Sequence, residues 1–272
     1  MPNYKVGDVV TRKSYGGDIA FQIVDIKAGD GNKPIYVLRG LIYRIHADSS
    51  EDDLVRQDAK RVKEGMNRYL AGASKHAVRN GQALRLPFLF RLRSRPGTVL
   101  HIDSSEDFLQ KCIEHYRNAG IRPIGKLADE SEQPGIVRGL LERYNPDIVV
   151  LTGHDSIRKN TGNINSLDNY RNSKYFIESV KEARSYEADH DRLCVFAGAC
   201  QSYFEGIMSA GANFASSPGR VLINALDPAL VSEKIALTDS RKIVTAREVA
   251  AVTITGSQGI GGKNTRGHMV IG

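Results

Sequence analysis

The chain has 272 residues, of which 41% are hydrophobic and 25% charged, the balance of an ordinary globular protein and not of a disordered one. This length accommodates one large domain, or a small domain followed by a medium one. The three cysteines are an odd number without a Cys-x-x-Cys pair, which argues against both a disulfide framework and a zinc ribbon. We find neither a membrane-spanning apolar run nor a signal-peptide pattern, so we expect no membrane partner.

The net charge of +7 is concentrated in one part of the chain. Eleven lysines and arginines fall between positions 56 and 95, and only Asp58 and Glu64 oppose them there. Such a segment could hold nucleic acid by charge attraction, with a steep dependence on salt concentration. Charge runs are more commonly solvated, and no pattern of stacking aromatic residues accompanies this one. We interpret it as a basic linker and expect no nucleic-acid partner, while nucleic-acid binding stays the alternative function.

Residues 1–50 predict a small β-rich domain. Turn residues separate four or five short apolar stretches, at 5–12, 19–26, 35–38 and 41–45. Strands this short and closely spaced are typical of an SH3-like β-barrel. Residues 51–97 then predict the basic helical linker, which ends at the boundary signal Pro96-Gly97.

Residues 98–272 alternate between strand and helix patterns. Apolar runs predict strands at 99–102, 147–151 and 193–197, with two more near 220–223 and 250–255. Helical patterns fall between them, at 107–118, 136–144, 170–186 and around 203–210. This alternation predicts an α/β fold with a doubly wound, mostly parallel sheet.

Two strand ends carry residues with catalytic chemistry. The run ending at Leu151 leads into His154, and the run ending at Ala197 leads into Cys200. Parallel strands deliver such residues to one sheet edge, where an imidazole and the start of a helix at Cys200 would favour the thiolate. His154 would then act as the base, and the backbone N–H groups of Cys200 and Asp155 would hold the oxyanion.

A structural explanation exists for each of these residues taken singly. A strand-end histidine often only packs, and a buried cysteine often behaves as a small hydrophobe, as we expect for Cys112 and Cys194. The pairing of Cys200 with His154 favours catalysis. We expect no cofactor and no metal, since Asp189-His190-Asp191 reads as a solvated turn. The glycine-rich residues 256–263 lack the spacing of a phosphate loop.

The paired blocks resemble the caspase-like cysteine proteases. In that clan one strand ends in His-Gly and a later one in Ala-Cys, with about 50 residues between histidine and cysteine in caspases. Here Ala199 precedes Cys200, and His154 lies 46 residues earlier. One departure is that Asp155 stands where the clan has glycine, and Gly153 precedes the histidine.

The whole chain resembles the YabG family of sporulation proteases from spore-forming bacteria. The matching motifs are Val6-Gly7-Asp8-Val9-Val10, Leu151-Thr152-Gly153-His154-Asp155, Gly198-Ala199-Cys200-Gln201-Ser202-Tyr203 and Ser216-Ser217-Pro218. The resemblance implies a protease of the mother-cell cytoplasm and forming spore coat. It also implies protein substrates from the spore coat and related spore proteins, cleavage after arginine, and self-processing.

Cleavage after arginine requires an acidic group in the pocket that receives the arginine. We predict that Asp103, at the end of the strand over 99–102, is this group; the alternative is that it only caps the next helix. Asp227 and Glu205 are weaker candidates. In the linker, Arg91, Arg93 and Arg95 are predicted self-cleavage sites, because nicking concentrates in connections between domains.

A rival interpretation also uses the cysteine. Class I amidotransferases carry Gly-x-Cys-x-Gly at a strand-to-helix elbow, and residues 198–202 differ from this pattern only at the last position. Those enzymes take a later histidine with glutamate two residues on. The only later histidine here is His268, and Val270 stands where that glutamate would be.

Overall fold

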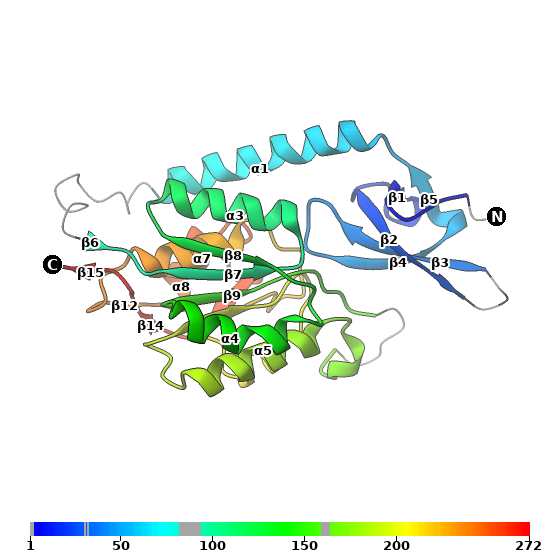
Figure 1. Cartoon of the computed structure of the whole chain (residues 1–272). Coiled ribbons are helices and arrows are strands. Elements are labelled where there is room, and N and C mark those ends of the chain that lie inside the picture. The colour runs from blue at the N-terminus through cyan, green and yellow to red at the C-terminus, as the bar shows by residue number, and fades with distance from the viewer. Residues whose placement is uncertain (1–2, 30, 32, 82–93, 159–163) are drawn as a thin grey trace.

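The computed structural model describes residues 3–29, 31, 33–81, 94–158 and 164–272 (Figure 1). An antiparallel sheet is built from the first part of the chain, and a long helix leads from it to an α/β domain. No described helix is both long and apolar enough to cross a membrane.

The N-terminal sheet has five antiparallel strands. In spatial order they are β4 (His46–Ser50), β3 (Pro34–Gly40), β2 (Phe21–Ala28), β1 (Val9–Arg12) and β5 (Leu54–Arg56). Alternate residues such as Val10, Ile23 and Leu38 form its core. No pairing between the edge strands β4 and β5 closes this sheet in the described part of the chain. The predicted β-rich segment therefore forms an antiparallel sheet, whereas a closed SH3-like barrel is not confirmed.

The strand predicted at 41–45 is wrong, because these residues connect β3 to β4 without forming a strand. Their apolar character has another cause. Leu41 and Ile42 pack against a separate buried cluster that contains Met66 and Phe108, outside the N-terminal sheet. We call residues 41–45 the insertion loop.

The helix α1 (Ala59–Gly81) runs beside α3 (Glu106–Asn118) along one side of the molecule (Figure 1). Met66 of α1 and Phe108 of α3 share the cluster that holds the insertion loop. The Tyr69 hydroxyl accepts a hydrogen bond of 3.0 Å from the Asn224 side chain. The predicted linker therefore includes a helix that packs on the α/β domain.

The α/β domain is built on a six-stranded sheet. Its spatial order is β8 (Pro123–Leu127), β7 (Val99–Asp103), β9 (Ile148–Leu151), β10 (Cys194–Ala197), β11 (Phe214–Ser216) and β13 (Ile260–Gly262). Neighbouring strands are parallel except that β13 runs antiparallel to β11. The predicted mostly parallel sheet is confirmed. Its strand order reverses between β7 and β9, the place where ligands bind in such sheets.

Helices cover both faces of this sheet (Figure 1). With α3, the helices α7 (Asp227–Ala236) and α8 (Ala246–Val252) pack on one face, and Ile148, Val150 and Phe196 point toward them. The helices α4 (Gln133–Tyr144), α5 (Ser173–Tyr186) and α6 (Phe204–Ser209) pack on the other. Val149 and Leu151 point to that second face. Burial on both faces explains why these strands are continuously apolar.

Four short strands form two small ribbons, in which β6 (Ser94–Arg95) pairs with β15 (Val270–Ile271) and β12 (Ile243–Val244) with β14 (Thr265–Arg266). The strands predicted at 220–223 and 250–255 are wrong. Residues 220–223 are irregular and contact Cys200, and α8 extends through Val252. β8 had escaped prediction because it is a half-exposed edge strand without an apolar run.

We expect Phe196→Ala to lower the free energy of unfolding by about 3–5 kcal/mol, because the ring is fully buried in the sheet's core. Urea unfolding followed by circular dichroism measures this change. Ile243→Ala is the control: Ile243 is 52% exposed, so its loss should change the value by at most about 0.5 kcal/mol. Equal effects of the two substitutions would contradict the assignment of the core.

Candidate active site

The candidate site lies beyond the carboxyl ends of β9 and β10. His154 and Cys200 each follow the last residue of their strand, Leu151 and Ala197, after the same short interval. Since β9 and β10 pair directly and in parallel, the two residues emerge at one edge of the sheet. The fold thus brings the predicted nucleophile and the predicted base to the same place.

Cys200 is fully buried in a tight turn. Gly198 adopts φ +111°, which favours glycine, and a Cβ there would lie 2.5 Å from Ser216 Oγ. The Cys200 Sγ accepts a hydrogen bond of 3.3 Å from the Ile223 N–H. Burial raises the pKa of the Cys200 thiol to about 12, against the opposing influence of the Ile223 N–H and the Arg44 guanidinium. The thiol is therefore protonated at neutral pH in this arrangement.

His154 is also fully buried, with its ring stacked on Phe108 at a centroid distance of 5.6 Å. Burial, and then the neighbouring His46, lower the pKa of His154, so the ring is neutral. Its Nε2 lies 3.2 Å from the Gly40 carbonyl oxygen, which can only accept, so Nε2 carries the proton. Nδ1, 3.4 Å from Ser104 Oγ, is then the basic nitrogen.

No hydrogen bond between the Cys200 thiol and the His154 ring occurs among the described residues. The thiol bonds to Ile223 and the ring to Gly40, so each is engaged elsewhere. The helix start predicted at Cys200 lies later, since α6 begins at Phe204. The arrangement is therefore a closed one, in which both groups are neutral and not coupled to each other.

Two backbone N–H groups converge on one carbonyl oxygen. The N–H of Cys200 donates to the Arg44 carbonyl oxygen at 3.1 Å, and the N–H of Asp155 donates to the same oxygen at 3.2 Å. These are the two predicted oxyanion donors, and both distances are ordinary hydrogen-bond lengths. The sheet edge can thus hold a peptide carbonyl between the two strand ends. The carbonyl held there belongs to the insertion loop.

The Arg44 side chain fills a buried pocket whose acidic group is Asp103. Arg44 Nη1 lies 2.6 Å from Asp103 Oδ2, and both side chains have 0% exposure. Nη2 donates to the Ala225 carbonyl oxygen at 3.1 Å, and the guanidinium carbon lies 4.8 Å from the centre of the Phe108 ring. Asp103 is not the side-chain cap of α3, because Ser105 takes that role by accepting from the Phe108 N–H.

Asp103 is held as a carboxylate. Burial alone raises the pKa of Asp103, but the Arg44 guanidinium and the His101 ring lower it more than burial raises it. Oδ2 accepts a hydrogen bond from Thr152 Oγ1 at 3.0 Å, and Oδ1 accepts from the Ser105 N–H at 2.9 Å. The negative charge is thereby fixed in position for a cationic side chain.

The Asp155 carboxylate ties the two strand ends together. Oδ1 accepts from the Asn172 N–H at 2.8 Å, at the start of α5. Oδ2 accepts from Ser173 Oγ at 2.5 Å and from Ser202 Oγ at 3.0 Å. Ser202 belongs to the turn that carries Cys200, so Asp155 sets the spacing of the two N–H donors. Burial raises the pKa of Asp155 to about 6, although Ser173, Asn172 and Ser202 act to lower it.

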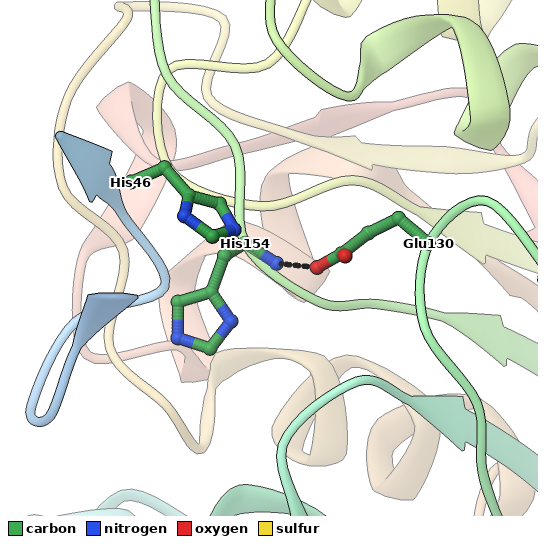
Figure 2. Close-up of side chains that lie close together, drawn as sticks. All are labelled: His46, Glu130 and His154. Carbon is green, nitrogen blue, oxygen red and sulfur yellow. Dashed lines mark hydrogen bonds between the residues drawn. The ribbon is translucent and has the colours of Figure 1, made fainter. Parts of the chain in front are cut away.

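His46, Glu130 and His154 form a buried cluster, with ligand-type atoms all within 4.8 Å of one another (Figure 2). Two imidazoles and a carboxylate are a donor set that zinc accepts. In this structure Glu130 Oε1 already accepts from the His154 N–H and from Ser104 Oγ, both at 2.6 Å. These bonds give Glu130 the task of positioning the His154 backbone.

The remaining predicted residues lie away from this edge or outside the described part of the chain. Arg91 and Arg93 lie outside the described residues, and Arg95 is in β6, paired with Val270. His268 packs on Gly97, just before β7 begins. It therefore lies near the amino ends of the parallel strands, whereas Cys200 lies beyond their carboxyl ends. It cannot serve Cys200 as the amidotransferase interpretation requires.

The two weaker acidic candidates have other partners. Asp227 accepts hydrogen bonds from the backbone of Asn224 and Ile254, and Glu205 pairs with Arg220 near the surface. Arg44 itself was missed by sequence reasoning. Its only local signal was a single charge inside an apolar stretch, which equally fits the polar face of a strand.

Comparison with known proteins places the chain among the peptidases. It matches the YabG peptidase U57 family over residues 5–272. It is 38% identical over 294 residues to the sporulation-specific protease YabG of Bacillus subtilis (strain 168), over 99% of this chain and 97% of that protein. The chain belongs to the YabG peptidase U57 family, which confirms the resemblance inferred from its motifs.

Among solved structures, the chain overlaps the A domain of carboxylic acid reductase from Segniliparus rugosus, in complex with AMP and a co-purified carboxylic acid. That overlap has a TM-score of 0.32 and 12% identity, over 76% of this chain and 26% of that chain. A likeness this distant supports no conclusion about the protein.

We expect Asp155→Asn to remove a pH-dependent part of the stability. With the pKa of Asp155 at about 6 in the folded protein and 3.8 as its ordinary value, the folded state retains a proton that the unfolded state releases between these pH values. Stability from this group therefore falls as pH rises from about 4 to 6, by about 3 kcal/mol. Urea unfolding at a series of pH values measures it. The buried histidines contribute equally in the unmodified protein and in Asp155→Asn. The readout is therefore the difference between their two curves of unfolding free energy against pH. Parallel curves would contradict the raised pKa of Asp155.

Proposed function

We propose that the protein is a sporulation-associated cysteine endopeptidase that cleaves spore-coat and related spore proteins after arginine. Cys200 is the nucleophile and forms a thioester acyl-enzyme, and His154 is the general base and acid. The site of action is the mother-cell cytoplasm and the forming spore coat. The sporulation context follows from the relative in Bacillus subtilis, which is named a sporulation-specific protease.

One observation carries the proposal. The N–H groups of Cys200 and Asp155 hold the carbonyl of an arginine, and the side chain of that same arginine pairs with Asp103. A peptidase acting after arginine needs these two features together: donors for the carbonyl oxygen beside the nucleophile, and an acidic pocket one side-chain length away. The donor distances of 3.1 and 3.2 Å support binding of the ground-state carbonyl.

The pocket chemistry favours arginine over lysine. The guanidinium bonds Asp103 through Nη1 and the Ala225 carbonyl through Nη2, while its flat face lies over Phe108. A lysine ammonium is a single point charge and cannot reach two acceptors in this spread geometry or stack in the same way. We therefore assign the arginine preference to Asp103 together with Ala225 and Phe108.

Catalysis requires the histidine to be released from its present partner. While His154 Nε2 donates to Gly40, the ring is held in an orientation in which it makes no hydrogen bond with the Cys200 thiol among the described residues. Loss of that contact lets the ring accept the Cys200 proton and later return it to the leaving amine. Entry of water would also lower the raised pKa of Cys200, since burial is the main cause of its shift.

Self-processing is part of this proposal. The linker arginines Arg91, Arg93 and Arg95 stay predicted cleavage sites, and Arg95 would have to leave its pairing with β15 to be cut.

We expect Cys200→Ala and His154→Ala each to reduce cleavage of arginine-containing peptides at least 1,000-fold, since each removes a group that takes part in bond making. Peptide cleavage followed by mass spectrometry measures the rates. Cys194→Ala is the matched control, because Cys194 is an equally buried free thiol within β10 and should leave the rate within about threefold. If Cys200→Ala still cleaved the peptides, this result would contradict a mechanism with Cys200 as the nucleophile.

We expect Asp103→Asn to lower kcat/KM for arginine peptides by roughly 100-fold or more, because it leaves the substrate guanidinium buried without a counter-charge. The readout is a competition between otherwise identical peptides with arginine, lysine or glutamine before the scissile bond. Asp103→Asn should lose most of the discrimination against glutamine. Unchanged selectivity would show that another group reads the side chain.

A further inference from the structure

We propose that the enzyme cleaves its own Arg44–Ile45 peptide bond, and that the insertion loop occupies the active site as a tethered substrate until it is cut. The proposal rests on the function proposed above and adds a defined cleavage site and a reason for the closed arrangement. The evidence for it is the way in which the backbone of the insertion loop and the Arg44 side chain are bound.

The loop backbone is paired on both sides of Arg44. Tyr43 forms an antiparallel bridge with Asn224, and Ile45 forms a parallel bridge with Asp155. The N–H of His46 donates to the Asp155 carbonyl oxygen at 3.1 Å. Proteins often bind an extended peptide through main-chain hydrogen bonds to an exposed strand edge, and these bonds do not depend on the side chains of the peptide. The candidate scissile bond therefore lies within a bound segment and not at its end.

The Arg44 side chain is placed as a specificity residue. Arginines are rarely fully buried, and Arg44 has 0% exposure although it stands in a connection between two strands. Its Nε has no hydrogen-bond partner in the described structure, and its two Nη atoms bond Asp103 and Ala225. Burial of an ion pair is a poor source of stability compared with an apolar pair of similar size. Recognition of an arginine explains this pocket better than structural need.

The loop blocks the site against other peptides. Both N–H donors, of Cys200 and Asp155, are taken by the Arg44 carbonyl, and Gly40 at the loop's base holds His154. An external peptide could use neither the donors nor the Asp103 pocket while the loop is seated. The linker helix α1 keeps it seated through Met66, which packs with Leu41 and Ile42, and through Tyr69, whose ring lies 6.1 Å from that of Tyr43.

The reaction balances as a hydrolysis. Once the contact between His154 and Gly40 has opened, His154 takes the thiol proton and the Cys200 sulfur attacks the Arg44 carbonyl carbon. The resulting oxyanion is held by the N–H groups of Cys200 and Asp155. Collapse breaks the bond to the Ile45 nitrogen, which receives the proton from His154. Water then attacks the thioester and releases Arg44 as a carboxylate; one of the two water protons returns to the sulfur and the other goes to solvent.

The cut would leave both fragments in place. Residues 1–44 retain β1, β2 and β3, and residues 45–272 retain β4 and β5, which pair with β3 and β1. We therefore expect fragments 1–44 and 45–272 to migrate together under native conditions and to separate only in denaturant. Only the loop ends become free to leave the pocket.

The first test follows the purified full-length chain over time by intact-mass spectrometry and N-terminal sequencing. The expected result is a new N-terminus at Ile45 in the unmodified protein and none in Cys200→Ala. Cleavage of an added arginine peptide is followed in the same samples. It should show a lag that ends as the 45–272 fragment accumulates.

Three variants separate binding from cutting. In Arg44→Gln, the rate at which the Ile45 N-terminus appears should fall at least 100-fold. This variant should cut the added peptide without a lag, because no arginine side chain fills the pocket. Ile45→Pro keeps the Arg44–Asp103 pair but resists cleavage, so it should cut the added peptide at least tenfold more slowly than the processed protein. Arg138→Gln is the matched control, since Arg138 on α4 pairs with Glu142 at the surface and should be processed normally.

The outcomes separate this inference from the proposed function. An added peptide cut after arginine without a lag, while the Arg44–Ile45 bond stays intact or only Arg91, Arg93 or Arg95 is cut, overturns the tethered substrate alone. The proposed function is overturned if none of the unmodified protein, Arg44→Gln and Arg138→Gln cuts any arginine peptide. If Arg44→Gln does not fold, Ile45→Pro decides. The inference is overturned if this variant stays uncut and still cleaves the added peptide as fast as the processed protein does.

Discussion

The buried pair between Arg44 and Asp103 is the contact on which the arrangement of the site depends. It joins the N-terminal sheet to the end of β7 across 59 positions of sequence, and water reaches neither partner. Taking two charges out of water costs several kcal/mol for each ion, so the pair persists only because other contacts hold the loop. Those contacts are the backbone bridges of Tyr43 and Ile45 and the packing of Leu41 and Ile42.

The parallel sheet supplies the other half of the site. β9 and β10 pair in register, which sets the two N–H donors side by side, and the Asp155 carboxylate then fixes the turn after each strand. This framework is independent of the loop, because its bonds run between α5, β9 and β10. The site is thus a preformed edge onto which a peptide is laid, and preformed donors are what carbonyl chemistry requires.

Closure of the site and the neutral state of Cys200 and His154 have the same cause. With the loop seated, Cys200 and His154 are cut off from water; burial raises the pKa of the thiol and lowers that of the imidazole, so neither carries charge. Removal of the loop would restore solvent to both groups at once. In the proposed mechanism a single segment therefore controls access to the pocket, occupation of the donors and the protonation of Cys200, and α1 links all three to the part of the chain that precedes the α/β domain.

The sequence by itself determined the α/β layering and the two strand ends that carry His154 and Cys200, because strands buried on both faces are continuously apolar and end abruptly at polar residues. It also placed Asp103 at the end of β7. Only the tertiary structure decided what fills the site. Leu41, Ile42 and Ile45 looked like the apolar residues of a strand, but Leu41 and Ile42 pack against Met66 and Phe108, far along the chain. β8 escaped notice because an edge strand needs little apolar surface. Arg44 escaped notice because an arginine becomes meaningful only beside the carboxylate that receives it, and no local pattern encodes a partner 59 residues away.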